Sequence, residues 1–227
     1  MSKLEVREIG PISGETEVRL AEGATAVGFG GGLGSVQYFT SSGTWTWDKT
    51  SGVTKIMVEV QGAGGSGVRA SKQETQNCGG GGGYTRKLID VSSITTATVT
   101  VGSGGVGPTT IDATGSDGGD SIWSDSINTL TGSGGVGAPS TAFTPGVGGT
   151  GTGGDLNISG GAGGLTTSPI GGFSILGYGG HRMHGSAQDS NCDGVFGGGG
   201  ATSRGVSGGN SRGGNGGDGI VIVTEYK

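Results

Sequence analysis

The stretch Cys78-Gly79-Gly80-Gly81-Gly82-Gly83 decides how this sequence can fold, because tracts of the same kind recur along the chain. Residues 197–200 and 213–217 form two further tracts, and 59 of the 227 residues are glycine. Glycine loses the most backbone entropy on folding and adds no side chain to a core. This composition disfavours a compact enzyme. It favours a structural or surface-recognition protein, in which a second copy of the chain supplies the missing burial.

Between the glycine tracts lie short runs of β-branched and aromatic residues. The clearest run, residues 54–61, places Ile56, Val58 and Val60 on one face. The apolar run 219–226 is expected inside a sheet, and residues 36–40 are expected to meet residues 44–47 across a turn at 41–43. Further strands are expected at residues 84–89, 97–101, 120–123 and 156–159. No segment has the 3.6-residue period of a helix.

The sequence therefore predicts an all-β fold, a β-sandwich with long glycine-rich loops. The tracts lack the strict Gly-X-Y period of collagen. Two arrangements remain open for them, namely loops or polyglycine helices of three residues per turn packed side by side. We expect two parts of the chain, an N-terminal segment and linker at residues 1–34 and a glycine-rich β domain at residues 35–227.

Charge and hydropathy exclude several classes of protein. The formal net charge is −5, and no Lys or Arg occurs between Lys87 and Arg182, so we expect no nucleic-acid partner. No apolar run reaches 18 residues, so we expect no membrane insertion. Residues 1–9 lack the apolar region of a signal peptide, so we expect synthesis in a cytoplasm. In that compartment Cys78 and Cys192 are expected as thiols, with a disulfide as the alternative.

The segment 1–34 carries apolar residues among charges, too few to form a core alone. We expect it to assemble copies of the chain or to attach them to another protein. Its candidate contact residues are Leu4, Val6, Ile9 and Ile12.

Two aspartate-containing tracts are candidates for calcium binding. Residues 213–221 fit the nonapeptide pattern G-G-x-G-x-D-x-U-x, and residues 115–123 fit it with one mismatch. The chemistry requires tandem copies, whereas these two lie far apart in the chain. The alternative is a turn that ends in Asp before a strand begins. We expect no bound metal and no cofactor.

Two loops rich in polar side chains, the first at residues 68–77 and the second at residues 178–196, are the candidate binding sites. Functional loops are often carried on a rigid scaffold. If Cys78 and Cys192 are close in space, the two loops are neighbours. No nucleophile elbow or phosphate-binding loop is present, so we expect no enzyme. The candidate receptor-binding residues are Tyr178, His181, Arg182, His184, Gln188, Asp189 and Asn191 of the second loop, and Arg69, Lys72 and Gln73 of the first.

The two ends of the β domain carry a resemblance to a known family. Residues 39–47, followed by 53–65, resemble the opening of the glycine-rich domain of bacteriophage tail-fibre and adhesin proteins. The tract 79–84 and the closing run 216–226 are similar to later motifs of that domain, so the resemblance covers about residues 36–226. Residues 3–14 also resemble the attachment segment of fibre proteins from phages of marine cyanobacteria. Arg7-Glu8 stands here where Asp-Thr is common.

The resemblance implies a virion protein, a homotrimer that is anchored to other virion proteins by its N-terminus. It would bind a glycan or protein on the host cell surface with a β-rich tip. One alternative is a knob or fibre that decorates the capsid without a defined receptor. A second alternative is a calcium-dependent β-roll lectin or enzyme.

Overall fold

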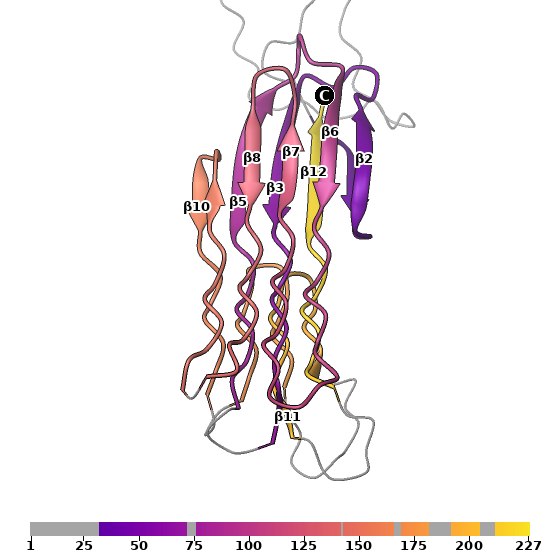
Figure 1. Ribbon diagram of the computed structural model, residues 1–227. Helices are drawn as coiled ribbons and strands as arrows, with labels where there is room; N and C mark the ends of the chain where they lie inside the picture. Colours follow the sequence, from indigo (N-terminus) through magenta and orange to yellow (C-terminus); the bar gives the residue numbers. More distant parts are fainter. Residues whose placement is uncertain (1–31, 72–75, 142, 166–168, 182–191, 205–211) are drawn as a thin grey trace, which may run out of the picture.

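The computed structural model describes residues 32–71, 76–141, 143–165, 169–181, 192–204 and 212–227. Within these ranges the chain forms strands β1 to β12 and no α-helix, which confirms the predicted all-β class. Two five-stranded antiparallel sheets lie at one end, and most of their strands run on into glycine-rich segments that make up the other end (Figure 1). The expected β-sandwich is therefore present, and a glycine-rich body extends from one end of it.

The first sheet contains the C-terminal strand in its interior, as the apolar run 219–226 predicts. Its strand order is β1-β12-β3-β5-β10. The strands are β1 at Leu33–Phe39, β12 at Ile220–Tyr226, β3 at Lys55–Gln61, β5 at Tyr84–Asp90 and β10 at Leu156–Ile158. β1 begins at Leu33, so the first residues of this sheet lie within the stretch 1–34.

The second sheet has the strand order β2-β6-β7-β8-β9. Its strands are β2 at Gly43–Asp48, β6 at Thr96–Val101, β7 at Ser121–Ser124, β8 at Thr129–Gly132 and β9 at Gly151–Thr152. The expected pairing of residues 36–40 with 44–47 is wrong, because β1 pairs with β12 and β2 pairs with β6. The turn between them carries the chain from one sheet to the other, which places Trp47 between the sheets. A short parallel pair, β4 at Arg69–Ala70 and β11 at Ser203–Arg204, lies apart from both sheets.

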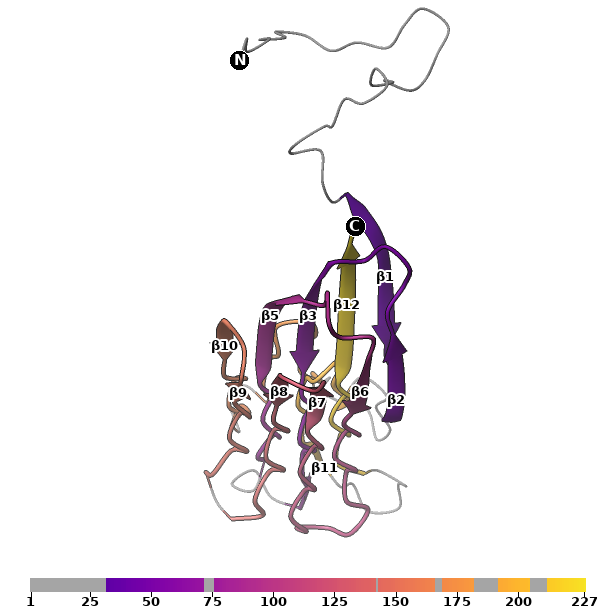
Figure 2. The same cartoon turned by 90° about the horizontal axis from the view of Figure 1, so that it is seen from above.

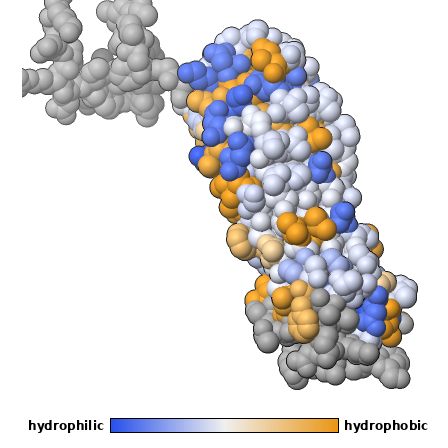
Figure 3. Space-filling view, turned by 60° about the vertical axis from the view of Figure 1, so that its left-hand side comes forward, coloured by the Kyte–Doolittle hydropathy of each residue, from blue (hydrophilic) through white to orange (hydrophobic). Residues whose placement is uncertain are grey.

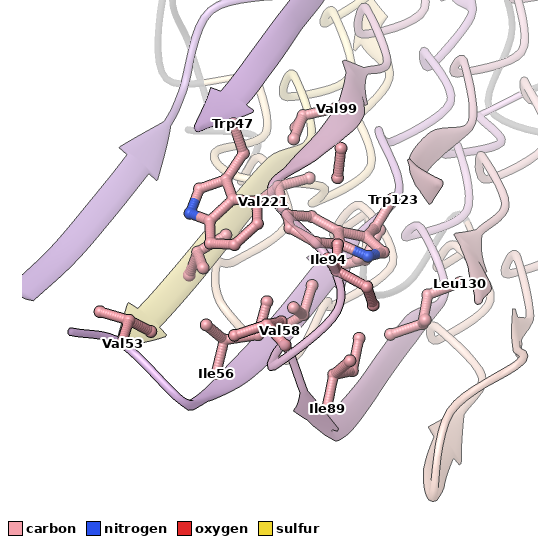
Figure 4. Close-up of a cluster of buried hydrophobic side chains, with 14 of the residues drawn as sticks. Trp47, Val53, Ile56, Val58, Ile89, Ile94, Val99, Trp123, Leu130 and Val221 are labelled. Carbon is pink, nitrogen blue, oxygen red and sulfur yellow. The ribbon is translucent and has the colours of Figure 1, made fainter. Parts of the chain in front are cut away.

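The core lies between the two sheets, and two tryptophan side chains are part of it (Figure 4). The rings of Trp47 and Trp123 lie 5.2 Å apart at 55°, and Ile56, Val58 and Val60 of β3 pack in the same cluster with no exposed surface. A tilted ring pair at this distance is favourable beyond its buried area. Apolar burial at this end therefore supplies the hydrophobic contribution that the glycine-rich end lacks.

A buried carboxylate links the two sheets at their margin. Glu225 of β12 has no exposed surface and accepts hydrogen bonds from Trp47 Nε1 at 3.0 Å and Gln37 Nε2 at 3.2 Å. Ser35 also donates to it. Burial alone would raise the pKa of Glu225, but these donors hold its pKa below the ordinary value.

The glycine tracts are packed helices and not loops, which settles the arrangement that the sequence left open. In segment 62–67, the first three amides donate to Gly83, Gly119 and Gly217. The next three donate in turn to Gly80, Ser116 and Gly214, so the direction repeats every third residue. Three residues per turn without internal hydrogen bonds is the geometry of the polyproline II helix. The amides of the segment therefore bond three neighbouring segments in rotation.

Two polyglycine segments, 62–67 and 78–83, are enclosed on all sides. Segment 78–83 donates to segments 160–164, 197–200 and 132–136, and it accepts from segments 62–65, 146–149 and the amide of Gly172. A Cβ added at Gly80 would lie 2.1 Å from the Val147 carbonyl oxygen, and one at Gly64 would lie 2.0 Å from that of Gly198. Only glycine permits backbones to approach this closely, which explains the composition.

Candidate functional site

The turns between the polyglycine segments open at the end of the molecule that faces away from the sheets (Figures 1 and 2). We call this end the tip. The opposite end holds both boundaries of the domain, since the amide of Lys227 donates to the carbonyl of Gly32 at 3.2 Å. The first described residue and the C-terminus therefore lie together, and the tip is the part of the domain farthest from them.

Arg69 is the first candidate residue that the structure places at the tip. It lies in β4, and its guanidinium donates to the carbonyl of Thr109 in a neighbouring turn. The amide of Asp112 donates to the Arg69 carbonyl at 2.8 Å, and its carboxylate accepts from the Ser71 amide at 2.9 Å. Asp112 has a φ of 54°, in the left-handed region that Asp tolerates better than most residues. These contacts tie two turns of the tip together.

An ion pair fixes a second part of the tip. Arg212 Nη1 and Nη2 donate to the two carboxylate oxygens of Asp193 at 2.8 and 2.7 Å. The same carboxylate accepts from the Asn215 amide at 2.7 Å. The hydrogen bonds to Asp193 raise the pKa of Arg212, because they stabilise its charged form. A bidentate pair fixes orientation more strongly than a single contact does.

Cys78 and Cys192 are both thiols and lie in one buried cluster with Ala201. The Thr202 amide donates to the Cys78 sulfur at 3.3 Å, and the Cys192 sulfur lies 3.9 Å from the Thr202 carbonyl oxygen. The condition that the sequence argument set, that the two cysteines are close in space, is therefore met, while residues 72–75 and 182–191 of the two polar loops lie outside the described residues.

Of the remaining candidates, Tyr178 and His181 lie on segment 177–181 at the side of the body. Tyr178 is 65% exposed and bonds through its backbone to Val195, while His181 is exposed and bridges to Ile170. The chain enters this segment beside the sheets, since the Leu176 amide reaches Gln61 Oε1. Tyr178 therefore lies nearer the sheets, and His181 nearer the tip.

The other predicted site residues fall outside the described residues. They are Lys72, Gln73, Arg182, His184, Gln188, Asp189 and Asn191 of the binding loops, and Leu4, Val6, Ile9 and Ile12 of the attachment segment.

Sequence reasoning missed two exposed apolar side chains at the tip, Ile111 and Phe143. They are 47% and 59% exposed and lie in the turns 108–114 and 139–144. Phe143 has a φ of 54°, which is costly for a bulky residue. Exposed apolar side chains that form a patch are typical of contact surfaces, whereas single ones are normal. The signal was a large apolar residue outside any strand pattern, three residues after Pro108 in one case and four residues after Pro139 in the other.

The aspartates of the two calcium-like tracts have structural partners in this fold. Asp117 and Asp120 accept from the amides of Gly137 and Gly134 at 2.7 and 2.9 Å. Asn215 and Asp218 accept from the amides of Gly107 and Gly104 at 2.8 and 2.7 Å. Each acceptor lies three residues from its companion, one turn of the polyglycine helix. These side chains satisfy outward-facing amides on the margin of the array.

The described part of the chain gathers no group of three His, Cys, Asp or Glu side chains that could hold a metal ion. It also contains no helix long and apolar enough to cross a membrane. The face seen in Figure 3 carries mostly residues of intermediate hydropathy, with hydrophobic side chains gathered over the sheets and toward the tip.

A family model described as a glycine-rich domain matches residues 40–226, most of the chain. No curated protein matches the sequence.

Proposed function

The chain belongs to the family of glycine-rich domains, and we propose that it is a short bacteriophage fibre or adhesin component that binds a host surface through its tip. The observation that carries this proposal is the opposition of the two ends. Gly32 and Lys227 lie together at the sheet end, and the turns between polyglycine segments open at the other. A protein anchored through residues 1–31 would therefore present its tip outward.

The body of packed helices suits this role mechanically. The amides of segments 62–67 and 78–83 donate in rotation to different neighbours, so the body is cross-linked in every lateral direction. Turns carried on such a body can change in sequence while the array beneath them is kept. Ile111, Phe143 and the Arg69 turn form the described part of the contact surface.

Assembly into a homotrimer through residues 1–34 belongs to the same proposal. Several tips held together would raise avidity without any further contact, provided that all can reach one surface. The expected partners at the other end are virion proteins, contacted by Leu4, Val6, Ile9 and Ile12. Light scattering on the purified full chain and on a variant without residues 1–31 tests assembly. A trimer that dissociates in the variant supports the proposal, and a monomer in both forms contradicts it.

Cell binding by fluorescently labelled protein tests recognition. A panel of bacterial strains would be compared for the natural chain, the tip variants Ile111→Ser and Phe143→Ser, and the control Val106→Ser. Val106 is 67% exposed but lies before the turn 108–114 and so outside both tip turns. We expect the tip variants to lose binding while their thermal stability and the binding of the control stay unchanged. A chain that binds virions but none of the strains would instead indicate the decorating role.

A further inference from the structure

A hollow on the outer face of the second sheet is distinct from the tip, and we propose that it binds a neutral oligosaccharide. It has a volume of about 360 Å³ and lies at the end of the sandwich away from the polyglycine body. Strands β2, β6 and β7 form its floor, and residues 93–95 and 124–126 form its walls. Its volume falls within the range of small-molecule sites.

Hydroxyl groups dominate the lining of this hollow. Thr46, Thr98 and Ser124 are direct cross-strand partners, so their side chains form one row across three strands. Thr95, Thr96, Ser93 and Ser126 add hydroxyls at the walls, while Ile94 and Ala97 lie beneath the hollow as members of the buried core. Within the described chain, no protein hydrogen bond holds the hydroxyls of the central row. They are therefore available to a ligand as donors and as acceptors.

Charge excludes most other ligand classes. Among the described residues, Asp125 is the one ionisable group in the lining, and its carboxylate is already engaged. Its Oδ1 accepts from the amides of Ile127 and Asn128 at 2.8 and 2.7 Å, and its Oδ2 accepts from Trp123 Nε1 at 2.9 Å. No Lys or Arg of the described chain lines the hollow to attract a phosphate, sulfate or carboxylate. The chemistry that remains is that of an uncharged ligand rich in hydroxyls.

The walls of the hollow are held in place before any ligand arrives. The Lys49 amide donates to the Thr95 carbonyl at 2.8 Å, and the Lys49 ammonium donates to the Val91 carbonyl at 2.9 Å. On the opposite wall, the hydrogen bonds to Asp125 close the turn that follows β7. A site that is already ordered loses less conformational entropy on binding.

The length of the central row sets the size of the ligand. A second cross-strand row, made of Thr44, Thr100, Ile122, Thr131 and Thr152, lies outside the hollow and is no part of the site. Neighbouring strands lie about 4.8 Å apart, so the row in the hollow spans about 10 Å. That length accommodates more than one sugar ring, which is why we infer an oligosaccharide and not a single sugar.

Saturation-transfer NMR on the full chain tests this site, with maltotriose, cellotriose and a linear galactotriose as neutral probes and sialyllactose as the anionic comparison. We expect saturation transfer to at least one neutral trisaccharide and weaker transfer to the anionic one. Titration calorimetry would then compare the natural chain with the double variant Thr98→Val/Ser124→Ala. Because two ligand hydrogen bonds are removed, we expect affinity to fall by about tenfold or more.

Thr131→Val is the matched control, because Thr131 lies on the same face but outside the hollow. It should bind the trisaccharide as the natural chain does, and all variants should keep the natural melting temperature. Absence of transfer to every neutral probe, or unchanged affinity in the double variant, would overturn the proposal. Neither result depends on cell binding by the tip, since the Ile111 and Phe143 variants leave this hollow intact.

Discussion

Replacing Gly80 with alanine tests the close packing of the polyglycine array most directly. Gly80 lies in the enclosed segment 78–83, and its φ is outside the left-handed region, so alanine can adopt the same backbone conformation. The substitution would by itself stabilise the fold by about 0.4–1 kcal/mol, because it lowers the entropy of the unfolded chain. The sign of the effect is therefore decided by the space around the new methyl group.

That space is occupied by backbone. The added Cβ would lie 2.1 Å from the Val147 carbonyl oxygen, whereas ordinary contact begins at 3.4 Å, so the segments must separate by 3.4 − 2.1 = 1.3 Å. Two hydrogen bonds join them, from Gly146 to Cys78 at 2.9 Å and from Gly149 to Gly81 at 2.8 Å. The shift would break both, at about 1–3 kcal/mol for each bond. The net loss is about 3 kcal/mol, a large share of the total stability of a domain.

Urea unfolding and calorimetry measure this loss. For a domain of this size we expect a fall in melting temperature of about 10 °C. Gly32→Ala is the control, because nothing lies within 4 Å of a Cβ added there. Its stability should stay within about 0.5 kcal/mol of the natural chain. If Gly80→Ala is as stable as this control, close backbone approach is not what requires glycine, and the reasoning fails.

Three further predictions concern single interactions. The pKa of Glu225 is lowered by folding, so its contribution to stability is present above the ordinary value of 4.5 and is lost as the pH falls through the lower folded value. Urea unfolding between pH 7 and pH 3 should show this loss, and Glu225→Gln should reduce it. Asp218→Ala removes the acceptor for the Gly104 amide and should lower the free energy of unfolding in urea by about 1 kcal/mol. Asp218→Asn keeps an acceptor oxygen and should retain the stability of the natural chain. Cys78 and Cys192 are buried, so a thiol reagent should label both only as fast as the protein opens. Rapid labelling without denaturant would contradict their burial.

The strands could be predicted because their apolar residues alternate with the period of the sheet. Ile56, Val58 and Val60 identify β3, and the run 220–223 identifies β12. β8 and β9 were missed, since they are short and merge into glycine. The pairing of β1 and β2 was wrongly predicted because proximity in sequence favours a hairpin. The partners of β1 and β2 are β12 and β6, and no local feature of residues 36–47 reveals that.

The polyglycine array could not be read from the tracts themselves, because glycine has no side chain to carry a period. The period was visible in the residues between the glycines. Asp117 and Asp120, like Asn215 and Asp218, are spaced by three and each bonds a neighbouring segment. The sequence argument instead matched the two tracts to the calcium-binding nonapeptide pattern. For the binding surface, polarity led to Arg69 but passed over Ile111 and Phe143, which have no charge.

The rotation of hydrogen bonds along each polyglycine segment sets a rule for how this protein can change its length. Successive amides of segment 62–67 donate hydrogen bonds to three different neighbouring segments in rotation. One inserted residue would therefore point every later amide toward a segment other than its hydrogen-bond partner. Insertions and deletions inside the body should therefore be tolerated only in steps of three residues, one whole turn. The turns of the tip are not bound by this three-residue period, so natural variation in loop length should accumulate there.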